Sequence, residues 1–178
     1  MLPLDSPMWG ELNHVYGSAE DSPQMLRALE KLDQISWGES SGPLDTFISA
    51  HYHQGDPNSA ALAAVPHLLR IGKSKGAGSL TRLLILIGWI ESVRDDAAPL
   101  EATALLAAYD EAIAEALELS LEAIQLPITD NEDFRHVLGA IAAFRGKKFL
   151  ALRLFELDAL YDEYLEKHGE DFTNRPKF

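Results

Sequence analysis

Apolar residues recur at helical spacing along almost the whole chain, and this periodicity limits the fold more than any other feature. No window shows the alternation of β-branched residues that is typical of a strand, and valine is scarce beside leucine and alanine. The sequence therefore predicts an all-α protein. The helices that we expect cover residues 7–16, 23–32, 44–51, 57–73, 80–93, 99–126, 130–144 and 147–168.

The order of these helices leaves two architectures open. Long helices joined by short loops favour antiparallel neighbours, which either stack as helical hairpins into an α-α superhelix or close into a helical bundle. A bundle could also form a homodimer through an apolar face such as residues 83–90. In both cases we expect one helical domain over residues 1–170, because 178 residues suffice for a single core. The tail, residues 171–178, lacks periodicity, which is typical of disordered termini.

Three stretches carry the signature of helical hairpins. Residues 65–69, VPHLL, resemble the core of the first helix of a HEAT repeat. Phe134 and Arg135, followed by glycine and alanines that allow close helix approach, resemble the second helix. Residues 53–69, HQGDPNSAALAAVPHLL, are similar to a stretch in a group of uncharacterised bacterial HEAT-like proteins. This resemblance implies an α-α superhelix whose usual work is to bind other macromolecules, and we favour it over the bundle.

The charge of the chain restricts its partners. The formal net charge is -13, and the second half is the more acidic, since residues 95–178 hold 18 acidic and 8 basic residues. Such a charge repels phosphate backbones, so we expect no nucleic-acid partner. An acidic surface suits a basic protein partner, although it also serves solubility alone.

The composition also indicates the compartment. The chain has no cysteine, which excludes disulfides, thiolate zinc sites and cysteine nucleophiles and fits a reducing compartment. The first residues do not form a signal peptide, and the most apolar run, residues 83–90, is shorter than the roughly 20 residues of a membrane helix. We expect a cytoplasmic protein without a membrane partner, in which residues 83–90 form a buried core helix.

A histidine cluster offers the first candidate site. His51 and His53 lie on the same side only in an extended segment, because two residues on a helix differ by about 200°. In that case the two imidazoles could bind a metal ion together with Asp56 or His67. The alternative hypothesis is then a small helical metal-binding protein or hydrolase that uses His51, His53, Asp56 and His67.

A structural interpretation of the same residues is better supported. Gly55 can end one helix, Asp56 can cap the next, and Pro57 can occupy its first position. A histidine can satisfy buried backbone groups at such a corner. We therefore expect residues 51–58 to form a corner between two helices.

Two further features have structural interpretations. Pro66 lies inside an expected helix, where it removes one backbone hydrogen bond at a cost of about 3 kcal/mol and kinks the axis. The aromatic residues of the last helix recur near helical spacing and are expected in the core. They are Phe149, Phe155, Tyr161 and Tyr164.

The second candidate site is a line of four glutamates on the helix expected over residues 99–126. This segment has six acidic residues and no basic one. The glutamates recur at spacings of four, three and four, which places them on one side of the helix. They form either a solvated surface or a docking face for a basic partner. The four residues are Glu111, Glu115, Glu118 and Glu122.

These observations favour a non-catalytic function. The chain has no P-loop, no dinucleotide-binding glycine pattern, no nucleophile elbow and no zinc-protease motif. The sequence therefore predicts no catalytic residue and no cofactor. Our hypothesis is a HEAT-like scaffold or adaptor that binds another protein, in a regulatory or toxin-neutralising role, with the four glutamates as the contact.

Overall fold

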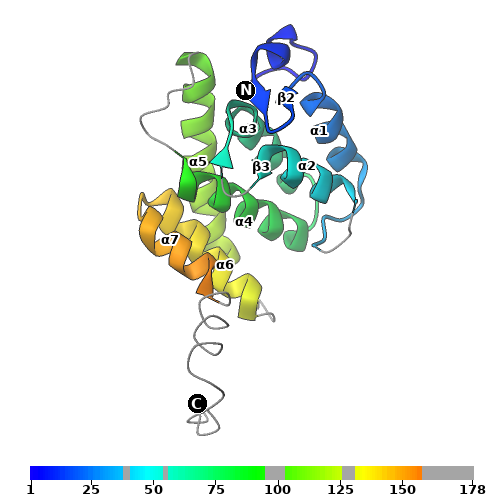
Figure 1. The fold of residues 1–178 in the computed structure, drawn as a ribbon. Helices are drawn as coiled ribbons and strands as arrows, with labels where there is room; N and C mark the ends of the chain where they lie inside the picture. Colours follow the sequence, from blue (N-terminus) through cyan, green and yellow to red (C-terminus); the bar gives the residue numbers. More distant parts are fainter. Residues whose placement is uncertain (38–40, 54–55, 95–102, 126–130, 158–178) are drawn as a thin grey trace, which may run out of the picture.

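The computed structural model of the protein describes residues 1–37, 41–53, 56–94, 103–125 and 131–157 (Figure 1). It confirms the all-α prediction, since helices dominate and the strands are two residues long. The expected tail over residues 171–178 lies outside the described residues. The elements are the 3₁₀-helix η1 (Pro7–Glu11), β1 (Asn13–His14), β2 (Gly17–Ser18), α1 (Ser22–Lys31), α2 (Pro43–His51), β3 (Tyr52–His53), β4 (Asp56–Pro57), α3 (Ser59–Lys73), α4 (Ala77–Val93), α5 (Thr103–Ala123), α6 (Asn131–Phe144) and α7 (Lys148–Phe155).

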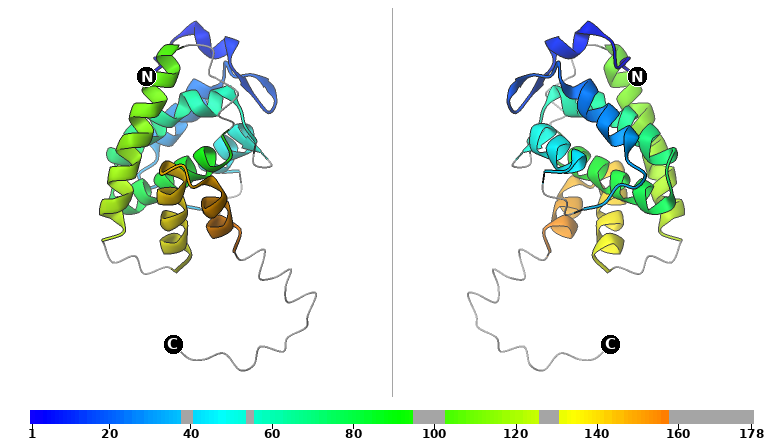
Figure 2. Two further views of the ribbon diagram at one scale, coloured as in Figure 1. Left: turned by 90° about the vertical axis from the view of Figure 1, so that its left-hand side faces the viewer. Right: turned by 90° about the vertical axis from the view of Figure 1, so that its right-hand side faces the viewer.

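Helices that are close in sequence pack against one another. α1 packs against α2 and α3, α3 against α4 and α5, and α4 against α5, α6 and α7. The N-terminal segment lies at one end of the molecule and the α6–α7 pair at the other, with the long α5 along one side (Figures 1 and 2). The contacts of α1, α3 and α4 with the two helices that follow each of them are those expected of stacked hairpins, while superhelical stacking stays a prediction.

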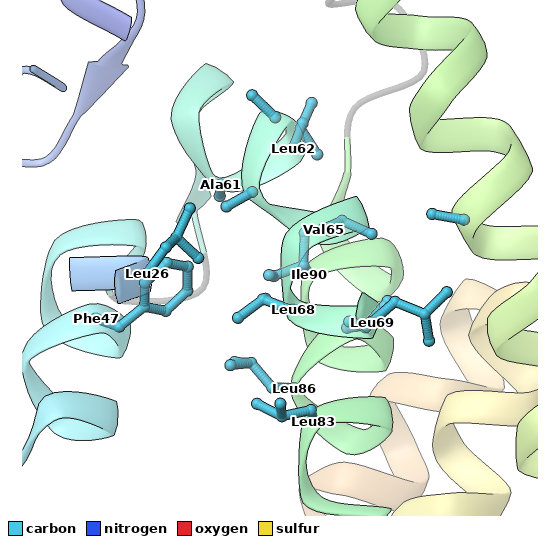
Figure 3. Close-up of a cluster of buried hydrophobic side chains, with 14 of the residues drawn as sticks. Leu26, Phe47, Ala61, Leu62, Val65, Leu68, Leu69, Leu83, Leu86 and Ile90 are labelled. Carbon is cyan, nitrogen blue, oxygen red and sulfur yellow. The ribbon is translucent and has the colours of Figure 1, made fainter. Parts of the chain in front are cut away.

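α4 is the centre of the core. Leu83, Leu84, Ile85, Leu86, Ile87 and Ile90 are all fully buried, as a helix that is apolar on every side requires. Figure 3 shows side chains of α4 facing those of α3, with Leu26 of α1 and Phe47 of α2 closing the cluster. The prediction of a buried core helix is confirmed. The prediction of a dimer surface at residues 83–90 is wrong, because other helices of the same chain cover this segment.

Small residues let α4 and α6 approach closely. A Cβ atom on Gly88 would lie 2.5 Å from Cβ and 2.6 Å from Cα of Ala140. A Cβ atom on Gly139 would lie 2.6 Å from the ring of Phe155 on α7. The sequence-based expectation of close approach through the small residues of α6 is therefore confirmed. Within the described ranges, no helix combines the length and the apolar composition needed to cross a membrane.

The N-terminal segment differs from the helix predicted over residues 7–16. Ser6 caps η1 as expected, but η1 ends at Glu11, and β1 and β2 then pair as an antiparallel hairpin. Gly17 has a φ of 118°, a conformation that side chains disfavour. The backbone N–H of Val15 donates to the carbonyl of Ala50 (3.0 Å). The chain therefore turns back towards α2, and the helix prediction is wrong beyond Glu11.

The pairing of β3 with β4 confirms the expected corner between α2 and α3, but the cap of α3 is a different residue. α3 begins at Ser59, and its N-cap is Asn58, whose side-chain oxygen accepts from the backbone N–H of Ala61 (3.0 Å). The amide nitrogen of Asn58 also donates to the carbonyl of Ala50 (3.2 Å). The prediction that Asp56 caps this helix with Pro57 at its first position is wrong. A carboxylate cannot donate to a carbonyl, whereas an amide joins both helix ends.

The aromatic residues of α7 divide between surface and core. Phe149 is 72% exposed, and the guanidinium of Arg153 lies 5.1 Å from the centre of its ring. The prediction that Phe149 belongs to the core is therefore wrong. Phe155 packs against Trp89 of α4, with 6.1 Å between the ring centres. Tyr161 and Tyr164 lie outside the described residues.

Replacing Gly88 by alanine should destabilise the fold. The added methyl group would meet the backbone of α6, so α4 and α6 must separate, and overpacking of this kind costs about 1–3 kcal/mol. Urea denaturation followed by circular dichroism measures the change. Gly78→Ala is the matched control in α4, because its Cβ would meet only the tip of Arg82 at 3.4 Å. Equal stabilities of the two variants would contradict the close approach.

Candidate functional site

His51 ends α2 inside the protein and uses both ring nitrogens. Nδ1 donates to the backbone carbonyl of Phe47 (3.0 Å), and Nε2 therefore accepts from the hydroxyl of Ser22 (2.8 Å). The imidazole also stacks on the ring of Phe47, with 4.1 Å between ring centres and an interplanar angle of 4°. Burial lowers the pKa of His51 to about 4, so the ring is neutral at pH 7.

The hydrogen bond between Ser22 and His51 has the length expected between a nucleophile and its base, but a substrate cannot reach these residues. In serine hydrolases a histidine accepts the serine proton and a third group orients the histidine. Here the carbonyl of Phe47 has the orienting position, and Ser22 and His51 are both fully buried. A substrate cannot reach a hydroxyl without exposed surface, so this arrangement fastens α1 to α2.

A second histidine lies beside His51. The rings of His14 and His51 meet edge to face, with 5.7 Å between their centres. The backbone N–H of Tyr16 donates to Nδ1 of His14 (3.0 Å), and Nε2 of His14 donates to the carboxylate of Asp21 (2.8 Å). His14 thus connects the β1–β2 hairpin to the N-cap of α1.

His67 of α3 contacts a different part of the chain, the N-terminal segment. Its Nε2 donates to the backbone carbonyl of Leu2 (2.7 Å), and its ring lies 6.0 Å from that of Trp9. Burial lowers the pKa of His67, which favours the neutral ring. Pro66 lies within α3, as predicted, directly before this histidine. His67 therefore holds the N-terminal segment against α3.

The metal-binding hypothesis gains no support from the described residues. Among them, no three histidine, aspartate or glutamate side chains lie close enough to share a metal ion. Both nitrogens of His51 are in hydrogen bonds, and one nitrogen of His67 is. The side chains of His53 and Asp56 lie outside the described part of the chain.

The predicted line of glutamates lies along the outer side of α5. Glu111, Glu118 and Glu122 are exposed, and Glu115 is partly exposed and forms an ion pair with Lys73 of α3. We call these four residues the acidic face of α5. Glu115 contributes less negative charge than the others, since Lys73 offsets it.

A groove lies between the acidic face and α3. It has a volume of about 440 Å³, and its apolar lining comes from Met1, Pro66, Leu69, Ala108 and Ala112. Charged side chains line it from both helices, with Arg70 and Lys73 on α3 and Glu111 and Glu115 on α5. Arg70 also forms an ion pair with Glu30 of α1. An apolar lining between charged walls can hold a segment of another chain.

Aromatic rings from distant parts of the sequence surround Trp89 of α4. Trp37 stacks on it with 5.1 Å between ring centres, and Tyr52 stacks with 6.1 Å. His136 and Phe155 meet it edge to face, at 5.9 and 6.1 Å. These contacts fix the orientation of the indole, because it has neighbours from four other segments of the chain.

A pocket of about 360 Å³ opens beside this cluster. It is lined by Trp37, Arg82, Trp89, Glu132, Asp133 and His136. Burial and the nearby Arg135 guanidinium lower the pKa of His136, so its ring is neutral at pH 7. We call this the Trp89 pocket. It combines aromatic surface with carboxylates, which is the chemistry of a binding site rather than of a core.

The sequence did not single out the residues of the Trp89 pocket. Trp37, Trp89 and His136 are far apart in the chain and belong to no common motif. The signals present were three tryptophans in a small protein and an acidic start to α6, and neither indicates which residues meet. Comparisons with family models, curated proteins and solved structures found no match. The candidate sites are therefore interpreted from their own chemistry.

Acidification should destabilise the protein through His51. The unfolded chain binds this proton near the ordinary pKa of 6.5, and the folded protein only near 4, so protons favour unfolding between these values. We expect the free energy of unfolding to fall by about 3 kcal/mol from this residue between pH 7.5 and pH 4, at about 1.4 kcal/mol per pKa unit. Urea denaturation at a series of pH values measures the loss.

His51→Gln is the control for this pH dependence. The variant should be less stable than the wild type at pH 7.5, because Ser22 and Phe47 lose their partner. Its stability should fall less steeply below pH 6.5, since the titrating group is gone. The carboxylates, His67 and His136 titrate in both proteins, so the difference between the curves reports His51. Parallel curves would show that His51 is not the buried neutral group.

Proposed function

We propose that this protein is a non-catalytic, HEAT-like scaffold that binds a basic surface of another protein in the cytoplasm. The observation that carries the proposal is the acidic face of α5, with its exposed glutamates beside an apolar groove. A scaffold of this kind suits a regulatory or toxin-neutralising role, in which binding alone is the activity.

The groove adds apolar surface beside the charges of the acidic face. Exposed ion pairs add little affinity by themselves, typically below about 1 kcal/mol each. Burial of apolar groups supplies most of the free energy of association, and charge supplies orientation and rate of encounter. The lining of Pro66, Leu69, Ala108 and Ala112 offers such burial directly beside Glu111.

The packing of the helices supports a HEAT-like scaffold. The first helix of each expected hairpin packs against the first helix of the next, as α1 does on α3 and α3 on α5. In HEAT-like proteins, helices stacked in this way present one continuous surface to a partner. The groove between α3 and α5 lies between two helices of that row.

The metal-binding or hydrolytic function is the weaker alternative. His51 is buried and bonded at both nitrogens, and Ser22 has no exposed surface. Nucleic acid and membranes are not the partners that we propose, because a net charge of -13 repels phosphate groups and anionic lipids.

Reversing charge on the acidic face should remove partner binding. We expect Glu118→Lys combined with Glu122→Lys to lower the amount of captured partner at least tenfold, because the face would then repel a basic surface. Both residues are exposed, so the fold should persist. The measurement is quantitative mass spectrometry of proteins captured from a lysate at about 0.1 M and about 1 M salt, where the Debye length falls from about 10 to about 3 Å.

A matched variant separates the face from the net charge. Glu11→Lys combined with Glu20→Lys changes the charge equally at exposed positions of the N-terminal segment. It should capture the partner as the wild type does. If both double variants lose the partner equally, overall charge rather than the acidic face controls binding. If neither does, the face is a solvated surface.

A further inference from the structure

The turn between α6 and α7 carries charge of the opposite sign to α5. Residues 144–155 contain four basic residues and no acidic one, in a chain with 28 acidic and 15 basic residues. Residues 99–126 contain six acidic residues and no basic one. A surface that only keeps a protein in solution usually mixes both signs. Here the two signs are instead sorted onto two separate parts of the fold.

Exposed apolar side chains lie among the basic residues of this turn. Phe149 is 72% exposed and Leu150 is 52% exposed. Both line one hollow of the surface together with Lys147, and the guanidinium of Arg153 lies 5.1 Å from the centre of the Phe149 ring. Arg145, Lys147 and Arg153 are themselves exposed. We call Arg145, Lys147, Phe149, Leu150 and Arg153 the basic corner.

The charges of the basic corner are not offset within the described part of the chain. No ion pair between described residues involves Arg145, Lys147 or Arg153. Lys148 is left out of the corner, because its ammonium donates to the backbone carbonyl of Arg94 (2.6 Å). The corner therefore presents three cationic groups beside two exposed apolar side chains.

The acidic face of α5 and its groove are complementary to this corner. Only Glu115 of the four glutamates forms an ion pair with a described residue, so Glu111, Glu118 and Glu122 can receive cationic groups. The groove of about 440 Å³ beside Glu111 has an apolar lining that can cover the ring of Phe149. We propose that the acidic face and its groove bind the basic corner of a second copy of this chain.

The two surfaces lie on different parts of one molecule. The groove is between α3 and α5, whereas the basic corner lies where α7 packs on α4 and α6. No residue lines both the groove and the hollow beside Phe149. The contact therefore joins two copies through two different surfaces. Each copy carries both surfaces, so copies form a reciprocal pair, a ring or an open chain.

The apolar and the ionic groups have different roles in this contact. Burial of Phe149 and Leu150 in the groove supplies affinity, because apolar groups leave water. The ionic groups steer the two copies together and fix their orientation. They are exposed, so dissolved salt screens them. Self-association of this kind should therefore weaken as the salt concentration rises.

This inference rests on the proposed function, because it uses the same acidic face. It adds that the chain carries its own competitor for that face. A basic partner protein must then displace the basic corner of a neighbouring copy, so self-association regulates access to the acidic face.

Sedimentation velocity of the purified full chain tests the contact. The wild type should pass from monomers to dimers or larger species as its concentration rises at about 0.1 M salt. At about 1 M salt the dissociation constant should be at least tenfold higher, because the Debye length falls from about 10 to about 3 Å. A wild type that stays monomeric up to its solubility limit overturns the proposal, and so does an assembly that salt does not weaken.

Two variants separate the two surfaces. Lys147→Gln combined with Phe149→Ser removes the corner, and Glu118→Lys combined with Glu122→Lys removes the face. All four side chains are exposed, so both variants should fold. Each alone should assemble at least tenfold more weakly than the wild type. An equal mixture should form a heterodimer, because the first variant keeps an intact face and the second an intact corner. A mixture that stays monomeric contradicts the proposal.

A third variant tests whether the position of these groups matters. Tyr16→Ser combined with Lys31→Gln removes an exposed aromatic ring and one positive charge from the N-terminal part of the chain. It should assemble as the wild type does, and equal weakening in this variant and the corner variant overturns the proposal. If circular dichroism shows a double variant to be unfolded, Lys147→Gln or Glu122→Lys alone replaces it.

Partner capture from a lysate is measured separately from self-association. A wild type that stays monomeric but captures a basic partner through the acidic face overturns self-association and leaves the proposed function standing. Self-association of a wild type whose captured proteins do not depend on the acidic face does the reverse.

Discussion

The fold depends on a helix that has no polar side. α4 is apolar around its whole circumference from Leu83 to Ile90, so water is excluded only if other helices cover it on all sides. α3, α5, α6 and α7 do so, and α6 comes closest because Gly88 accepts Ala140 against its backbone. The same contact brings α6 and α7 beside Trp89, which links the core to the Trp89 pocket.

The sequence correctly predicted the elements whose conformation depends on a local pattern of residues. Helical spacing located α1 to α6 and the corner before α3, because apolar period and proline are properties of short windows. It failed where a distant contact decides the conformation. The backbone N–H of Val15 donates to the carbonyl of Ala50, and the side-chain amide of Asn58 donates to the same carbonyl. Neither the β1–β2 hairpin nor the cap of α3 can therefore be predicted from the residues next to it in the sequence. The Trp89 pocket was missed for the same reason, since its residues meet only after α4, α6 and the segment after α1 have packed.

The buried polar groups show how this core tolerates histidine and glutamate. His51 and His67 each bond to a backbone carbonyl, and burial keeps both rings neutral. The carboxylate of Glu91 accepts from Tyr109 of α5 (2.5 Å) and from Arg94 (2.8 Å). Bonds of this kind fix the register of neighbouring helices, because a buried polar group without its partner costs about 1–3 kcal/mol. His51 and His67, two of the histidines with a catalytic interpretation, thus connect separate segments of the chain.

The acidic side chains of α5 and α6 lie outside the core, and their positions bear on function. α5 turns Tyr109, Ala112 and Ala116 inward and its glutamates outward, while α6 has Glu132 and Asp133 in its first turn beside the tryptophans. An acidic surface that served solubility alone would need neither an apolar groove nor an ordered aromatic wall next to it. Carboxylates beside apolar surface occur at both places, and that combination is consistent with the proposed binding of a basic partner.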